Sequence, residues 1–136
     1  MRFETKIAIL VRDDLPVWQK LNMTAFLASG VAAGRGNVIG EQYEDGSGNR
    51  YLAMFGQPVM VFAADATMLR TAWQKAIDRE LAVAVFTDDL FQTGNDIDNR
   101  AAVRAVPAEK LSFAGLALHG RRNDVDKVVK GLPLHP

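Results

Sequence analysis

The stretch that decides the fold is residues 6–34, KIAILVRDDLPVWQKLNMTAFLASGVAAG. Residues 7–11 are all apolar and rich in β-branched side chains, which is typical of a strand buried on both faces. From Val17 the apolar residues recur at helical spacing, and Gly34 ends that pattern. The stretch therefore predicts a buried strand, an acidic turn and a long helix.

The turn that joins this strand to its helix carries the helix start signals. Asp13 or Asp14 can cap the helix, because a short carboxylate accepts hydrogen bonds from the free N–H groups of the first turn. Pro16 fits that first turn, where its missing N–H is not needed. Residues 34–50 then contain five glycines and show no periodicity, which predicts a long loop with a turn at residues 45–48.

The rest of the chain alternates between apolar runs and amphipathic segments. We expect strands at residues 51–55, 59–63, 81–86 and 111–119, and helices at residues 69–81, 99–106 and 124–130. Asp65 or Thr67 would cap the first of these helices, Asp98 the second and Asn123 the third. This order predicts an α/β fold, a three-layer α/β/α sandwich with a mixed, mostly parallel sheet of four or five strands.

Composition limits the class of protein. The 136 residues suit one domain over 1–136, and 49% hydrophobic with 24% charged residues indicates a folded globular chain. No apolar run approaches the roughly 20 residues of a membrane helix, and we recognise no targeting segment, so a cytoplasmic protein is expected. The absence of cysteine excludes disulfides, thiolate metal sites and a cysteine nucleophile.

The charges balance overall but not along the chain. Residues 100–136 hold seven basic and three acidic residues, a net charge of +4, and the remainder has the opposite net charge. Such a basic segment can contact an RNA phosphate, or it can be a solvated surface that complements the acidic remainder. The two histidines, His119 and His135, have no partner at metal-ligand or triad spacing, and we predict neither a metal nor another cofactor.

Two predicted strands end in a pair of acids, Asp13-Asp14 and Asp88-Asp89. Ligands of open α/β sheets bind beyond the carboxyl ends of the strands. If the two strands are parallel neighbours, four carboxylates meet there, and they would form an acid–base pair or attract a divalent cation. The alternative is that each pair supplies one helix cap and one solvated turn residue.

Three segments, in chain order, resemble the type II peptidyl-tRNA hydrolases. They are IAILVRDDL at residues 7–15, VAVFTDDL at residues 83–90 and LALHGRRNDVDKVVKGLPL at residues 116–134. Within that fold, the chain is similar to a group of small bacterial proteins catalogued as a domain of unknown function. The resemblance implies the fold, a homodimer and a site at the strand ends. This chain departs from the hydrolase pattern in the first helix, where it has no histidine, and in the residues after Asp89. For this reason tRNA is not the expected partner.

We therefore expect a small-ligand-binding site or a divergent hydrolase site at the strand ends. The alternatives are peptidyl-tRNA hydrolysis, with basic C-terminal residues near the tRNA backbone, and a non-catalytic dimeric interaction module. The residues expected at the site are Asp88, Asp89 and Lys20 for catalysis, and Asp13, Asp14 and Asn22 for ligand binding, with Asn22 on the wall of one shared cleft.

Overall fold

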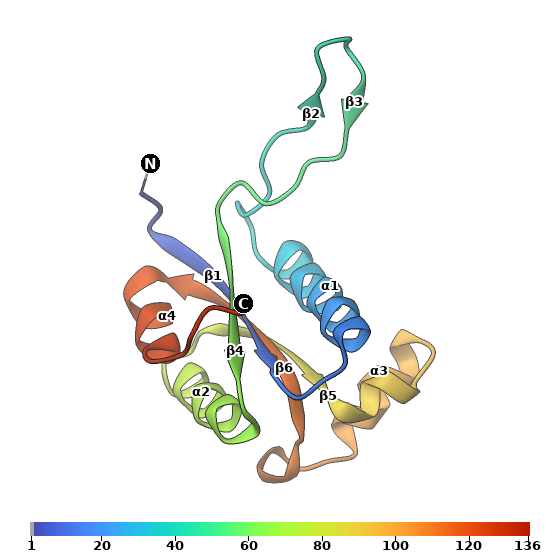
Figure 1. The fold of residues 1–136 in the computed structure, drawn as a ribbon, viewed down its shortest axis with the longest axis vertical. Helices are drawn as coiled ribbons and strands as arrows, with labels where there is room; N and C mark the ends of the chain where they lie inside the picture. The colour runs from blue at the N-terminus through green and yellow to red at the C-terminus, as the bar shows by residue number, and fades with distance from the viewer. Residues whose placement is uncertain (1) are drawn as a thin grey trace.

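A four-stranded sheet in the order β4-β1-β6-β5 forms the centre of the computed structural model, which describes residues 2–136 (Figure 1). Its strands are β1 (Thr5–Arg12), β4 (Val59–Ala64), β5 (Ala82–Thr87) and β6 (Phe113–Arg121). β1 runs parallel to β4 and antiparallel to β6, and β6 also runs antiparallel to β5. The expected number of strands and the mixed sheet are confirmed.

The expectation of a mostly parallel sheet is wrong, because one of the three strand pairs is parallel. The reason lies in the connection after β5. The 3₁₀ turn η1 (Asp88–Gln92), helix α3 (Asp96–Arg104) and the 3₁₀ turn η2 (Ala108–Lys110) stay at the end of the sheet where β5 finishes (Figure 1). The chain does not cross back over the sheet, so β6 starts at that same end and runs in the opposite direction.

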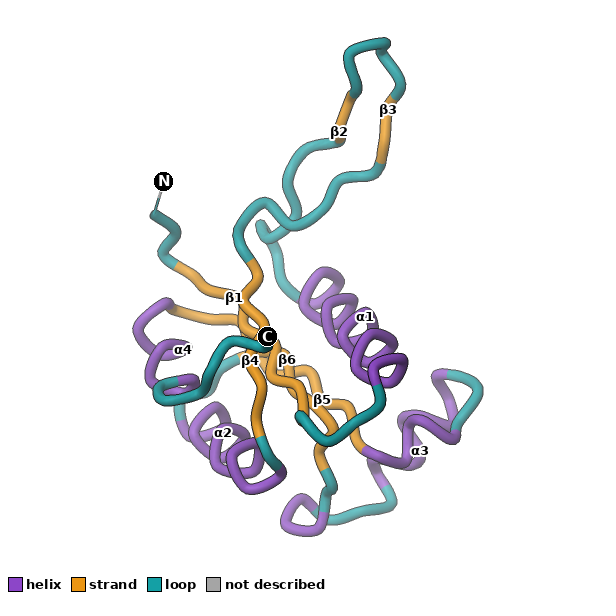
Figure 2. The backbone as a smooth tube through the Cα atoms, in the orientation of Figure 1, coloured by secondary structure: helices purple, strands orange, loops and turns teal. Residues whose placement is uncertain are grey.

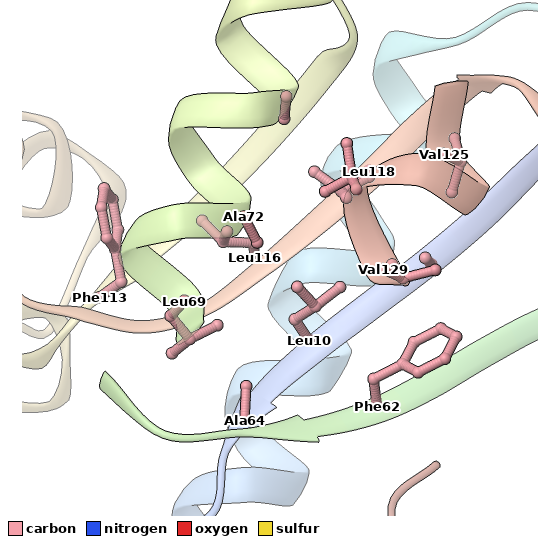
Figure 3. Close-up of a cluster of buried hydrophobic side chains, with 13 residues drawn as sticks. Leu10, Phe62, Ala64, Leu69, Ala72, Phe113, Leu116, Leu118, Val125 and Val129 are labelled. Atoms are coloured by element: carbon pink, nitrogen blue, oxygen red, sulfur yellow. The ribbon is translucent and has the colours of Figure 1, made fainter. Parts of the chain in front are cut away.

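Helices cover both faces of the sheet, as predicted. Helix α1 (Val17–Gly34) packs on one face, and α2 (Ala66–Asp78) and α4 (Arg122–Val129) pack on the other (Figure 1). Alternating residues of each strand feed the two layers, because successive strand side chains point to opposite faces. In β1, Ile9 packs under α1, whereas Leu10 joins the core beneath α2 and α4 (Figure 3).

Gly115 in β6 is a point of close approach between the sheet and α1. A Cβ atom at this position would lie 2.7 Å from Met23 Sδ of α1 and 2.8 Å from the backbone oxygen of Leu10. On the opposite face, Trp73 of α2 stacks on Phe113 with their ring centroids 5.6 Å apart. Glycine thus allows α1 to lie directly on the middle of the sheet.

Helix starts follow the predicted signals only in part. Asp65 caps α2 by accepting a 2.8 Å hydrogen bond from the Met68 N–H, as expected. The capping roles of Asp13 and Asp14 are wrong, because α1 begins after Pro16 with no side-chain cap. The backbone N–H of Asp13 instead donates to Ala64 O at 3.0 Å, which holds the turn beside the end of β4.

The two later caps also differ from expectation. Asn95, not Asp98, caps α3, and its side-chain oxygen accepts a 2.9 Å hydrogen bond from the Asp98 N–H. α4 starts at Arg122 and has no side-chain cap, so Asn123 lies inside the helix. In both places several capping residue types stand close together: a local cap by Asn95 begins α3, whereas at the start of α4 the Arg122 N–H donates to Glu4 O at 2.9 Å.

The segment predicted as a loop is an arm, which we define as residues 39–55. Its strands β2 (Tyr43–Glu44) and β3 (Arg50–Tyr51) pair antiparallel around the predicted turn, and an Ile39–Phe55 bridge closes its base. The arm projects away from the sheet and the helices (Figure 2). The strand expected over residues 51–55 is therefore wrong beyond Tyr51, because it pairs inside the arm and not in the main sheet.

The C-terminal tail, residues 132–136, lies along the outer edge of β4. Ala63 N–H donates to Pro133 O and His135 N–H donates to Val61 O, both at 2.9 Å. This pairing covers an edge strand that would otherwise be open to other chains. Among the helices of residues 2–136, none is long and apolar enough to cross a membrane.

Candidate functional site

Arg12 is the centre of the polar cluster at the strand ends. As the last residue of β1, it directs its guanidinium across the sheet, where Nη1 and Nη2 donate to the two carboxylate oxygens of Asp88 at 3.0 and 2.8 Å. Its Nε donates to Asp14 at 2.7 Å, and Nη1 also donates to Phe113 O at 2.8 Å. One arginine therefore joins the two acidic turns and the start of β6.

β6 lies between β1 and β5, so the two acidic turns are one strand apart. The side chain of Arg12 spans this distance and contacts both turns. The turns are not neighbours, so the predicted convergence of four carboxylates is wrong. Asp13 and Asp89 are both exposed, and no group of three or more His, Asp or Glu side chains within residues 2–136 is placed to hold a metal ion. A bidentate arginine–carboxylate pair occupies the place where a cation was considered.

The electrostatics of the cluster fix the charge of Asp88. Burial alone would raise the pKa of this carboxyl, but hydrogen bonds from Arg12 and Ser112 and the positive charge of Arg12 lower its pKa overall. The hydrogen bond to Asp88 is also the main cause that raises the pKa of Arg12. Asp88 is thus ionised at neutral pH, so it can orient a bound group or accept a hydrogen bond, but it cannot donate a proton.

Lys20 lies apart from this cluster. Its Nζ is 3.2 Å from Nε2 of His135, in the C-terminal tail that pairs with β4. β4 and β5 are the opposite edges of the main sheet, so the structure does not bring Lys20 together with Asp88. The sequence shows no partner for His135, and the pairing of the tail with β4 is what places it beside α1.

Asn22 is exposed on α1, one helical turn from Trp18 and one from Phe26. Both aromatic neighbours reach toward the end of β5, since Trp18 packs edge-on against Phe91 and Phe26 packs against Phe86. Asn22 is therefore on the β5 side of α1, but it does not line the groove described next.

A groove of about 600 Å³ lies between α1, β5 and α3. Its apolar surface comes from α1, β5 and η1, with Phe26, Leu27, Ala84, Phe86 and Leu90. Its polar rim comes from Ser29 of α1 and from α3, with Asp96, Asn99, Arg100 and Arg104. The size and the mixture of an apolar floor with a few polar groups match small-molecule sites.

The rim of the groove is set by helical spacing on α3. Asp96, Arg100 and Arg104 follow each other at four-residue intervals, so they share one side of the helix. Arg100 donates to Asp96 at 2.9 Å, and within residues 2–136 no ion pair engages Arg104. The groove therefore has one guanidinium at its rim that can receive an anionic group. Sequence reasoning missed this site, because α3 was expected to start at Asn99 and its side facing β5 was not recognised.

His119 is a buried polar group near the other end of β5. Arg35 Nε donates to its Nδ1 at 3.0 Å, so the ring hydrogen lies on Nε2, which has no hydrogen-bond partner within residues 2–136. Burial, and then the positive charge of Arg35, lowers the pKa of His119. The ring is therefore neutral at neutral pH, which is consistent with a packing role in β6.

The chain is similar to a protein family and to a solved structure, both of unknown function. No curated protein matches the chain. A solved structure of a protein of unknown function from Agrobacterium tumefaciens strain C58 is similar, with a TM-score of 0.95 and 43% sequence identity over 99% of this chain and 100% of the other. The family model described as "Protein of unknown function (DUF2000)" matches residues 5–136. The chain therefore belongs to the DUF2000 family.

Proposed function

We propose that the chain binds a small molecule with an apolar body and a carboxylate in the groove between α1, β5 and α3. The observation that carries this proposal is the position of Arg104 on the rim of a groove with an aromatic floor. Apolar surface would bury the body of the ligand, and a guanidinium would pair with its carboxylate through charge-assisted hydrogen bonds.

The surroundings of the groove support this kind of ligand. Phe26 and Phe86 lie with their ring centroids 5.9 Å apart and both line the groove, so they offer an aromatic surface to a flat apolar group. β5 is an edge strand of the main sheet, so alternate backbone N–H and C=O groups on its outer side are free to hydrogen-bond a ligand.

A titration with 3-phenylpropionate, followed by amide NMR, tests the proposal. We expect saturable shifts of Phe86, Leu90 and the α3 amides at millimolar concentrations. Arg104→Gln should weaken binding at least about tenfold, since a charge-assisted hydrogen bond contributes about 1.5–3 kcal/mol.

Two controls make the titration specific. Arg121→Gln removes an exposed arginine outside the groove and should leave binding unchanged. The neutral analogue 3-phenylpropionamide should bind more weakly than the acid. Equal binding of acid and amide, or shifts that spread over the whole surface, would contradict the proposal.

The strand-end cluster is the second place where the expected function can reside. Asp88 held ionised by Arg12, with Ser112 donating to it, suits a positioning role beside the groove, because Leu90 of the following turn lines that groove. Catalytic roles for Asp88, Asp89 and Lys20, and ligand contacts by Asp13, Asp14 and Asn22, stay predictions. A divergent hydrolase would require the bound ligand to reach Asp88.

We further infer a relation to the type II peptidyl-tRNA hydrolase fold. The three resembling segments form β1 with its turn, β5 with its turn, and β6 with α4 and the tail, which supports this inference.

Peptidyl-tRNA hydrolysis stays an alternative activity, favoured by one observation. Arg2, Arg121 and Arg122 line one hollow of about 590 Å³ together with Glu4. Turnover of a model peptidyl-tRNA at low salt would establish it, and lack of salt-sensitive RNA binding would remove it. A cytoplasmic location likewise stays a prediction.

A further inference from the structure

The outer face of α1 is apolar and uncovered. Val17, Trp18 and Leu21 are 70%, 60% and 68% exposed, although the opposite face of the helix already packs on the sheet. Lys20 is the single charged residue among the 18 residues of α1. A helix that is apolar on all sides is normally buried on all sides. The outer face of α1 therefore has the character of an interface.

The arm is a second apolar surface without cover. Its large apolar side chains, Ile39, Tyr43, Tyr51, Leu52 and Met54, are between 43% and 83% exposed. A two-stranded ribbon is marginally stable by itself and needs a third layer against which to pack. The arm extends beyond the C-terminal end of α1 and away from the rest of the chain, so it does not cover its own α1 (Figure 1).

We propose that two copies of the chain associate about a two-fold axis, with the arm of each copy lying along the outer face of α1 of the other. A two-fold interface needs one chain to carry both complementary surfaces, and this chain does. When the two α1 helices run antiparallel, each arm points toward the N-terminal half of the partner's α1. That half carries the exposed side chains of Val17, Trp18 and Leu21.

The dimensions of the two surfaces agree. An 18-residue helix is about 27 Å long, and the six or seven residues on each side of the arm span roughly 20 Å. The eight large apolar side chains of α1 and the arm expose roughly 100 Å² each. Their burial from both copies would remove up to roughly 1,600 Å² from water, close to the size of a standard stable interface.

Charge also favours a second copy as the occupant. The arm carries Glu41, Glu44 and Asp45 against Arg50, a net charge of −2. The N-terminal half of α1 carries Lys20, and the first turn of that helix has no acidic residue and no side-chain cap. An acidic arm is therefore attracted to Lys20 and to the helix dipole, an attraction that the exposed carboxylates of Asp13 and Asp14 just before α1 partly offset.

Sedimentation velocity of the full chain and of three variants tests this interface. We expect the wild type to be a dimer at micromolar concentrations. Leu21→Glu on α1 and Leu52→Glu on the arm should each give monomers, with at least tenfold weaker association. Ile97→Glu on α3 is the matched control, because Ile97 is 72% exposed and lies on neither surface. Far-UV circular dichroism and thermal melts of all variants confirm that they are folded.

Disulfide trapping tests which surfaces meet. The chain has no cysteine, so only the introduced cysteines can form a crosslink. Leu21→Cys and Leu52→Cys chains, purified separately and mixed under mild oxidation, should form a crosslinked pair that contains one of each. Leu52→Cys mixed with Ile97→Cys should not form a mixed pair. A wild-type monomer overturns the proposal and leaves the face to a different partner. A dimer that survives Leu52→Glu, or the absence of the mixed crosslink, also overturns it.

Discussion

Arg12 shows how one side chain can take the place that the sequence suggested for a cation. The two Asp-Asp pairs, considered alone, predicted carboxylates that meet at the strand ends and attract a positive charge. Arg12 instead contacts one acid of each pair, and its side chain is only 12% exposed. Each pair thus has one acid that Arg12 contacts, Asp14 or Asp88, and one that it does not, Asp13 or Asp89.

Replacement of Asp88 by asparagine should therefore destabilise the fold. The change removes the charge that pairs with Arg12, and the 41% exposure of the Asp88 side chain limits the loss to about 1–2 kcal/mol of the free energy of unfolding. Urea denaturation at neutral pH measures it. Asp89→Asn is the matched control and should change stability by less than about 0.5 kcal/mol. Equal effects of the two substitutions would contradict the assignment.

The same pair predicts a pH dependence. Folding lowers the pKa of Asp88. The Arg12–Asp88 pair therefore contributes its full share of the free energy of unfolding above the unfolded pKa of about 3.9. That contribution is lost as the pH falls through the lower pKa of the folded state. The stability difference between wild type and Asp88→Asn should be constant from about pH 5 to 8 and narrow below about pH 4. A stability difference between the two proteins that grows as the pH falls would contradict this prediction.

The residues of the site were only partly predictable. Asp14 and Asp88 follow apolar strands, so their position at the strand ends was readable from the sequence. The partner was not, because a sequence does not show that β6 lies between β1 and β5, or that Arg12 spans the gap. Arg104 and His135 depend on where α3 and the tail pack, which no local pattern encodes.

At the scale of elements, the arm is the clearest case of local order. Asp45 at its turn accepts hydrogen bonds from the Tyr51 hydroxyl at 2.7 Å, from the Asn49 side chain at 3.0 Å and from the Ser47 and Asn49 backbone N–H groups. These bonds lower the pKa of Asp45 to about 2, and the Tyr51 hydroxyl is the largest cause. The turn is therefore pre-organised although it is exposed.

Tyr51→Phe should raise the pKa of Asp45 toward the usual aspartate range, because it removes the strongest of these hydrogen bonds. The pH titration of the Asp45 carboxyl carbon by NMR measures this shift. Tyr43→Phe is the matched control, since Tyr43 faces Tyr51 across the arm but has no hydrogen bond to Asp45 within residues 2–136. An unchanged titration in Tyr51→Phe would show that the backbone donors alone set this pKa.

Elements with a strong period were the most predictable. The apolar runs of β1, β4, β5 and β6 and the amphipathic pattern of α2 place these elements within a few residues. The arm was expected as a loop, because its strands are two residues long and exposed, and thus leave no apolar alternation.

At the scale of the whole molecule, the tail completes the sheet from outside. Deletion of residues 133–136 removes the hydrogen bonds to Ala63 and Val61 and the contact between His135 and Lys20. The Ala63 N–H should then exchange with deuterium faster than in the full chain. Backbone N–H groups of β1, which has a strand on each side, serve as the internal control. Unchanged exchange at Ala63 would contradict the role of the tail.

The direction of β6 was the main feature of the whole molecule that the sequence did not determine. Apolar content shows that a strand is buried, but a strand buried in either direction has the same content. Direction depends on whether the preceding connection crosses the sheet. The α3 segment is long enough to do so, and only its packing at the end of β5 prevents it.

The position of β6 in the sheet has a consequence for biosynthesis. β6 is the last strand in the chain, yet it lies between β1 and β5 and hydrogen-bonds to both. Before β6 has emerged from the ribosome, β1 has only β4 beside it and β5 has no neighbour in the sheet. Domains generally fold as units, so the main sheet is expected to form only once β6 has emerged. The apolar strands β1, β4 and β5 are therefore exposed together in the nascent chain until that point.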